Sequence, residues 1–128
     1  MNKFDLNNKN AIITGGAQGF GLDIAKRFIQ SGAKVIIWDI DEKELKKAST
    51  LINDQNLSCN VVDVSDAKSV DDTVNKITSK TKIDILINNA GITGSTAELW
   101  NYDYEEWKKI ININLHGTFN CCKSVVPH

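Results

Sequence analysis

The sequence lacks the features that would place the protein in a membrane, outside the cell or on nucleic acid. None of its apolar runs reaches the length that crosses a bilayer, and residues 1–8 contain no apolar stretch of the kind found in signal peptides. The formal net charge is −1, and charges of both signs are interspersed without a basic stripe. We therefore expect a cytoplasmic protein that binds neither nucleic acid nor membranes.

Cysteine and histidine are also scarce. The three cysteines, Cys59, Cys121 and Cys122, are odd in number and lack the Cys-x-x-Cys spacing used by zinc and redox sites. His116 and His128 are each isolated in the sequence, as packing or surface histidines are. We expect no metal site and no disulfide, only reduced and partly buried thiols, which fits the cytoplasm.

The pattern of apolar residues predicts the fold class. With 41% hydrophobic residues, the 128-residue chain is large enough for a core, and we expect one domain over residues 1–128. Short β-branched runs alternate with helical spacing. We expect strands at 10–14, 34–39, 57–63 and 83–87, and helices at about 21–30, 41–52, 65–77 and 103–126. Because parallel strands need crossover connections, the alternation predicts an α/β fold, a parallel sheet of order 3-2-1-4 with helices on both faces.

Polar residues in front of the helical patterns mark the expected helix starts. Asp41, with a glutamate three residues later, resembles a capping box, and either Ser65 or Asp66 can cap the third helix. The second helix is then expected to turn one apolar face to the core, formed by Leu45, Ala48, Leu51 and Ile52.

The stretch Thr14-Gly15-Gly16-Ala17-Gln18-Gly19-Phe20-Gly21 lies between an apolar run and a helical pattern. This order is typical of the strand–turn–helix opening of a Rossmann-type dinucleotide fold. Glycine permits positive φ and close backbone approach to a pyrophosphate, at which the next helix aims its free N–H groups. The spacing differs from Gly-x-Gly-x-x-Gly, so a turn without a ligand is the alternative. We assign Gly15, Gly19, Phe20 and Gly21 to a cofactor site.

Acidic and amide residues stand at the carboxyl ends of the other expected strands. Asp39 ends the second strand, at the separation from the glycines where an acid meets the adenosine ribose. A carboxylate there accepts hydrogen bonds from both ribose hydroxyls but repels a 2′-phosphate, which favours NAD over NADP. The alternative is a solvated acid that begins a loop. Asp63 and Asn89 fall at the same edge of the sheet.

Four motifs together resemble the short-chain dehydrogenase/reductases over essentially the whole chain. They are Thr14-Gly15-x-x-x-Gly19-x-Gly21, Asp63-Val64, Asn88-Asn89-Ala90-Gly91 and Asn114-Leu115-x-Gly117. The sequence is similar to bacterial 3-oxoacyl-carrier-protein reductase-like members and to NAD-linked sugar and sugar-acid dehydrogenases. The resemblance implies hydride transfer between a nicotinamide cofactor and a secondary alcohol or ketone.

The resemblance also implies roles for individual residues. It places Asp63 and Val64 at the adenine, and Asn114 in the catalytic set, where it holds a water of the proton relay. The resemblance also implies that the carboxyl edge of the sheet beside the cofactor is shaped by Asn89, Ala90 and Gly91. An amide on a mostly apolar helix needs hydrogen-bond partners in any case, so a purely structural Asn114 is the alternative.

The family's catalytic Ser and Tyr-x-x-x-Lys pair follow the asparagine, and this chain reaches His128 before any of them. Tyr104 and Lys108 match the spacing but precede Asn114, so we interpret them as a chance match on an exposed helix start. We expect the cofactor-binding part of an NAD-linked oxidoreductase, inactive alone. A non-catalytic nucleotide-binding or interaction module is the alternative; Asn88-Asn89-Ala90-Gly91 argues against a methyltransferase.

Self-association is expected because the last predicted strand lies at an edge of the sheet. A sheet that ends at residues 83–87 leaves an apolar strand edge, and such edges pair with other chains. In the family, the helix at 103–126 helps to form the subunit interface. We therefore expect a homo-oligomer.

Overall fold

The structure is a computed structural model that describes residues 3–128. Met1 and Asn2, the first residues of the stretch in which no signal peptide is expected, lie outside the described residues. Within residues 3–128, no helix combines the length and apolar character needed to span a bilayer.

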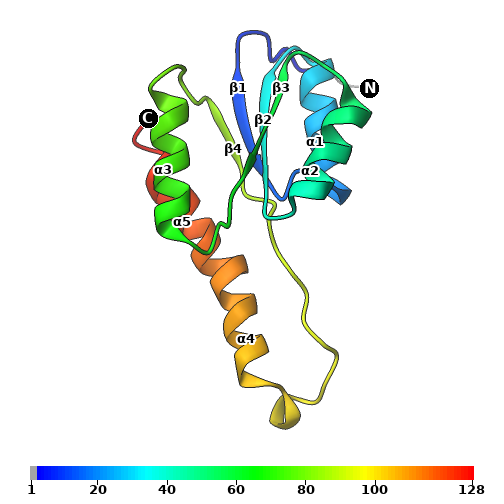
Figure 1. Cartoon of the computed structure of the whole chain (residues 1–128), viewed down its shortest axis with the longest axis vertical. Coiled ribbons are helices and arrows are strands. Elements are labelled where there is room, and N and C mark those ends of the chain that lie inside the picture. The colour runs from blue at the N-terminus through cyan, green and yellow to red at the C-terminus, as the bar shows by residue number, and fades with distance from the viewer. Residues whose placement is uncertain (1–2) are drawn as a thin grey trace.

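A four-stranded parallel sheet forms the centre of the molecule, with strand order β3-β2-β1-β4 as predicted (Figure 1). The central strand β1 pairs with β2 on one side and β4 on the other, so that Ala11 lies opposite both Val35 and Ile85. The strands are β1 (Asn10–Thr14), β2 (Lys34–Asp39), β3 (Leu57–Val61) and β4 (Ile85–Ile87).

Helices cover both faces of this sheet (Figure 1). Because side chains alternate along a strand, Ile13 packs with α1 and α2 on one face, whereas the neighbouring Ile12 packs with α3 and α5 on the other. Trp38 is fully buried on the Ile12 side. The α-helices are α1 (Gly19–Gln30), α2 (Glu42–Ile52), α3 (Ala67–Thr78), α4 (Tyr104–Ile111) and α5 (Gly117–Val125).

Several predicted boundaries were wrong by two residues. Helix α1 begins at Gly19, before the expected start near Gly21. Strand β3 ends at Val61 instead of Asp63, which turns into the loop that precedes α3. Strand β4 begins at Ile85 instead of residue 83, because the Asp84 carboxylate accepts the hydrogen bond from the Asn10 N–H at 3.0 Å.

The caps and faces of α2 and α3 follow the prediction with one correction. Asp41 caps α2, and Asp66 rather than Ser65 caps α3 by accepting from two backbone N–H groups. Leu45 and Ala48 are buried as expected, but Leu51 is 64% exposed. It lies at the edge of the apolar face of α2 and is exposed, whereas the neighbouring Ile52 is half-buried against the core.

The expected single helix from Asp103 is instead divided in three. Asp103 caps α4, a π-helical segment (η2, Asn112–His116) follows, and α5 completes the path. Helix α4 and the 3₁₀ turn before it (η1, Leu99–Asn101) extend beyond the end of the sheet and bury no residue, whereas α5 packs on the sheet through Cys121 and Val125 (Figure 1).

Candidate cofactor site

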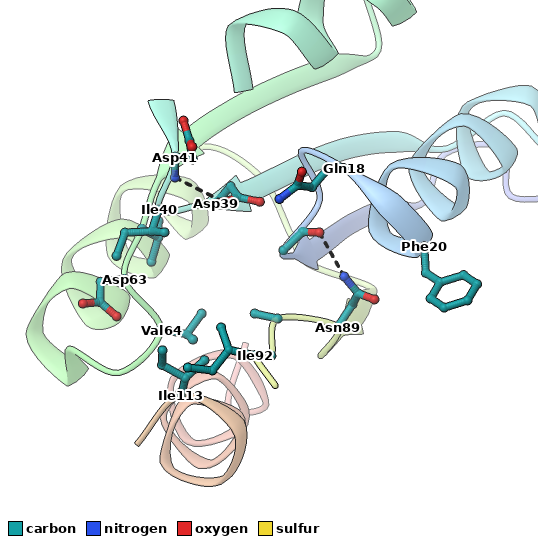
Figure 2. A pocket seen from close by; sticks show the side chains of 14 residues that line it. Gln18, Phe20, Asp39, Ile40, Asp41, Asp63, Val64, Asn89, Ile92 and Ile113 are labelled. Carbon is teal, nitrogen blue, oxygen red and sulfur yellow. Dashed lines mark hydrogen bonds between the residues drawn. The ribbon is translucent and has the colours of Figure 1, made fainter. Parts of the chain in front are cut away.

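A cavity of about 470 Å³ lies at the carboxyl edge of the sheet, where the prediction placed the ligand (Figure 2). Its walls include eight residues that the sequence singled out: Gly15, Phe20, Asp39, Asp63, Val64, Asn89, Ala90 and Gly91. Gly19 and Gly21 lie in the first turn of α1, directly after the loop that contains Gly15, and do not line the cavity. Sequence reasoning missed the lining residues Gln18, Ile40, Asp41, Val62, Ile92 and Ile113.

Each of the three assigned glycines has a different physical reason to be glycine. Gly15 has φ +61°, and a Cβ there would lie 2.9 Å from the Cα of Ala90. A Cβ on Gly21 would overlap the Gly15 carbonyl. Gly19 has φ +56° and faces open space. The backbone at Gly15 and Gly21 is therefore packed closely against its neighbours, which include Asn89 after β4. The backbone at Gly19 has no such neighbour and remains accessible.

The start of α1 completes this loop. Its N-cap residue Gln18 makes no side-chain capping hydrogen bond, so the N–H groups of the first helical turn remain for another acceptor. The positive end of the helix dipole favours an anion at that position. Phe20, in the same turn, is 84% exposed and points away from the cavity centre in Figure 2.

Thr14 and Asn89 join the end of β1 to the segment after β4. The Thr14 hydroxyl accepts from the backbone N–H groups of Asn89 and Ala90 at 3.1 and 3.0 Å. The Asn89 side-chain nitrogen donates to the Thr14 carbonyl at 3.1 Å. It also donates to the Gly15 carbonyl at 2.9 Å (Figure 2). Asn89 thus ties the segment after β4 to the end of β1; the contact beside the cofactor that the resemblance implies stays a prediction. Sequence reasoning gave Thr14 no role. A hydroxyl at the end of a buried apolar strand nevertheless indicates a side chain that needs hydrogen-bond partners.

The Asp39 carboxylate connects the end of β2 to the glycine loop. One oxygen accepts from the Ala17 N–H at 3.2 Å, and the other accepts from the Asp41 N–H at 3.1 Å. Asp39, Asp41 and Asp63 all line the cavity, and no Lys or Arg is among its lining residues. The cavity is therefore electronegative at the end beside β2, and Asp39 is not a merely solvated loop acid.

Asp63 and Val64 form the cavity wall next to β3. The Asp63 carboxylate accepts from the backbone N–H and the hydroxyl of Ser65, at 2.9 and 2.6 Å. Val64 is buried, and its carbonyl accepts from the side chain of Asn120 in α5 at 3.0 Å. A Cβ on Gly117 would lie 2.7 Å from Val64, so this glycine permits the close packing of α5 on the wall.

Asn114 is exposed, not buried as an amide on an apolar helix was expected to be, yet its side chain is hydrogen-bonded. It lies in the π-helical segment, and its side-chain oxygen accepts from the Ile92 N–H at 2.8 Å. Its side-chain nitrogen donates to the Ile92 carbonyl at 2.9 Å. The amide therefore holds the backbone of a cavity-lining residue. The relay role implied by the resemblance stays a prediction.

Tyr104 and Lys108 do not line the cavity. Tyr104 is 70% exposed, as expected for the start of a surface helix. The Lys108 ammonium lies 5.2 Å from the centre of the Tyr104 ring and pairs with Glu105 at 2.7 Å. This arrangement is an exposed helical pair, held by local contacts.

The cysteines add no reactive group to the site. Cys59 and Cys122 are half-buried, Cys121 is buried, and all three are free thiols. Burial raises the pKa of the Cys121 thiol to about 12, so it stays protonated at neutral pH. Within residues 3–128, no cluster of three or more His, Cys, Asp or Glu side chains has the arrangement of a metal site.

Comparisons with known proteins agree with this geometry. The family model described as short chain dehydrogenase matches residues 9–128. The chain is 40% identical to 3-oxoacyl-acyl-carrier-protein reductase FabG of Chlamydia trachomatis, over 93% of this chain and 49% of the relative. It is 37% identical to 2-dehydro-3-deoxy-L-rhamnonate dehydrogenase (NAD(+)) of a Sphingomonas strain, over 91% and 47%.

A solved structure is similar over the same extent. The 3-ketoacyl-(acyl-carrier-protein) reductase of Brucella melitensis, complexed with NADH, superposes with a TM-score of 0.91 at 35% identity. The match covers 97% of this chain and 51% of that protein. The chain thus spans about half the length of the relatives it matches. By sequence and by fold, it belongs to the short-chain dehydrogenase/reductase family.

Proposed function

We propose that this chain is the cofactor-binding part of an NAD-dependent oxidoreductase acting on a secondary alcohol or ketone. One observation carries the proposal: the glycine loop after β1 and the Asp39 carboxylate after β2 line one cavity and are hydrogen-bonded to each other. A glycine loop that can approach a pyrophosphate, next to a carboxylate that can accept hydrogen bonds from a ribose, is the arrangement that a dinucleotide requires.

The residues present fit such a cofactor. The pyrophosphate would lie against the loop at Gly19 and the uncapped start of α1, where the backbone is open and helix N–H groups remain. Asp39 would hold the adenosine ribose, because each carboxylate oxygen accepts more than one hydrogen bond and each has one protein donor here. Asp63 and Val64 would flank the adenine.

The cofactor preference follows from charge. A 2′-phosphate next to Asp39 would face a carboxylate, with Asp41 as a second acid and no basic lining residue to offset either. NAD(H) is therefore the proposed cofactor, in preference to NADP(H).

When bound, the nicotinamide ring supplies the hydride chemistry, and the chain's own residues orient it. Ala90, Gly91 and Ile92 line the cavity beyond β4, on the far side of β1 from Asp39, so they would flank the nicotinamide half. Asn114 keeps one N–H and one lone pair after bonding Ile92, which suits a relay water.

We further propose that residues 1–128 form a single NAD-binding domain and that the chain assembles as a homo-oligomer. The second candidate function is a non-catalytic nucleotide-binding module. The position of Tyr104 and Lys108 outside the cavity favours it for the chain on its own, since this pair then does not serve the site.

Calorimetric titration with NADH and NADPH tests the proposal. We expect saturable NADH binding that is tighter than NADPH binding. The absence of binding by either dinucleotide would refute both candidate functions, and tighter NADPH binding would refute the role given to Asp39.

A further inference from the structure

Residues 92–95, which we name the wall segment, leave the carboxyl edge of the sheet directly after Gly91. The segment continues toward η1 while α4 returns from η1 toward the sheet, and both extend beyond the sheet end (Figure 1). Ile92, its first residue, lines the cavity. Through Ile92, the wall segment therefore forms part of the cavity wall beyond β4.

The helical path holds the wall segment at two points. Asn114 bonds the backbone of Ile92 through both ends of its amide. Eight residues earlier in the helical path, Glu106 accepts from the Ser95 N–H at 2.9 Å and from the Ser95 hydroxyl at 2.8 Å. Since residue 92 meets residue 114 and residue 95 meets residue 106, the segment runs antiparallel to the helix.

The Glu106 contact is unexpected from local sequence. Asp103 and Glu106 have the spacing of a capping box, in which the glutamate side chain reaches back to the N–H of the capping residue. Asp103 does accept from the Glu106 N–H, at 2.7 Å. The half-buried Glu106 carboxylate, however, is bonded to Ser95, eleven residues away, and so holds the wall segment.

Gly94 shows how closely the segment approaches the helix. A Cβ on Gly94 would lie 2.5 Å from Ile110 and would overlap the Tyr102 hydroxyl. Tyr102 is itself held edge-on to Trp107, with ring centres 6.3 Å apart. At Gly94 the segment therefore lies against Tyr102 and Ile110 of the helical path with no room for a side chain.

We propose that Glu106 is a positioning residue for the nicotinamide half of the cofactor, acting through Ser95 and the wall segment. The inference rests on the proposed function, which places the adenosine at Asp39 beside β2. Because β1 separates β2 from β4, the wall segment lies at the opposite end of the cavity, where the nicotinamide would bind.

The test compares two ligands that differ only in the nicotinamide end. NADH and ADP-ribose share the adenosine, the pyrophosphate and the second ribose, but ADP-ribose lacks the nicotinamide ring. Calorimetric titration uses the chain, Glu106→Ala and the matched control Glu105→Ala, an exposed neighbour paired with Lys108. We expect Glu106→Ala to weaken NADH binding about tenfold, the effect of one charged hydrogen bond, and to change ADP-ribose binding less than about twofold.

Two further variants keep the proposal falsifiable if Glu106→Ala folds poorly. Ser95→Ala removes the hydroxyl donor, and Gly94→Ala pushes the segment from α4; both are expected to show the same selective loss of NADH affinity. Equal losses for the two ligands, or no loss for either, would overturn the positioning role.

Amide hydrogen exchange of the ligand-free chain separates this inference from the proposed function. We expect the Ser95 amide to be protected in the chain and in Glu105→Ala, and to lose protection in Glu106→Ala. An unprotected Ser95 amide would overturn the inference whatever the ligands do. A protected Ser95 in a chain that binds neither ligand would instead show that the proposed function fails.

Discussion

Thr14 and Asn89 exchange hydrogen bonds across the central strands: the Thr14 hydroxyl accepts from the Asn89 N–H, and the Asn89 side chain donates to the Thr14 carbonyl, both at 3.1 Å. Two chain segments 75 residues apart are thereby held together at the carboxyl edge of the sheet. The glycine loop follows Thr14 directly, and the wall segment begins three residues after Asn89, so this contact links their positions.

The Thr14 hydroxyl is expected to stabilise the fold measurably. Thr14→Val keeps the shape but removes the acceptor of the Ala90 N–H and leaves the Asn89 N–H with the Ile87 carbonyl, at a cost of about 1–3 kcal/mol in the free energy of unfolding. Thr50→Val is the matched control, because its hydroxyl only bonds the Lys46 carbonyl on the exposed face of α2. Urea unfolding measures both; equal effects would contradict the assignment.

Asp39 is expected to decide the cofactor preference. A 2′-phosphate charge about 4 Å from Asp39 would cost about 1–4 kcal/mol, depending on the effective dielectric constant. Asp39→Asn should therefore weaken NADH binding and narrow the NADH-to-NADPH affinity ratio. Asp23→Asn, on the exposed side of α1 and paired only with Lys26, serves as the control and should leave the ratio unchanged. An unchanged ratio in Asp39→Asn would count against the charge argument.

The glycine loop offers a contrast between two positions of similar φ. Both Gly15→Ala and Gly19→Ala place a side chain in the left-handed region, at a cost of about 1–2 kcal/mol. Only at Gly15 would the added Cβ also meet the Ala90 backbone. Thermal unfolding should thus show a larger loss of stability for Gly15→Ala, and comparable losses would refute the packing role of Gly15.

The chain alone is expected to transfer no hydride. General acid–base help is worth about 10²–10⁴-fold, and Tyr104 lies outside the cavity on an exposed helix start. We expect NADH binding by fluorescence, no change at the nicotinamide absorbance band with secondary alcohols or ketones, and no effect of Tyr104→Phe on binding. Turnover that Tyr104→Phe abolishes would make the Tyr104–Lys108 pair the true site.

Self-association is expected from two surfaces. Strand β4 forms one edge of the sheet, and large apolar side chains are exposed on η1 and α5, including Trp100 at 79% and Phe119 at 61%. An exposed strand edge together with exposed apolar side chains favours association with another copy of the chain. Light scattering at micromolar concentration should show dimers or larger species; a sharp monomer with cooperative melting would contradict this expectation.

Local sequence determined most of the scaffold and half of the site. Apolar spacing indicated each strand and helix, because burial depends on a periodicity that neighbouring residues set. The glycine cluster and Asp39 were found because a strand–turn–helix and a strand end place them at one sheet edge in any parallel fold. Asp41 was found as a cap because capping is a contact between residues two or three apart.

Tertiary structure decided the contacts that join distant segments. Leu51 matches a helical face in sequence, yet it is exposed while Ile52 packs on the core, since only packing determines how much of that face is covered. Glu106 has the spacing of a local cap, but its carboxylate bonds Ser95 because the fold brings that serine within 2.9 Å. Asn114 is exposed and could have bonded water, so its pairing with Ile92 came from the three-dimensional path of the chain. Periodicity carries no information about such pairs, because their energies depend on which segments the fold brings together.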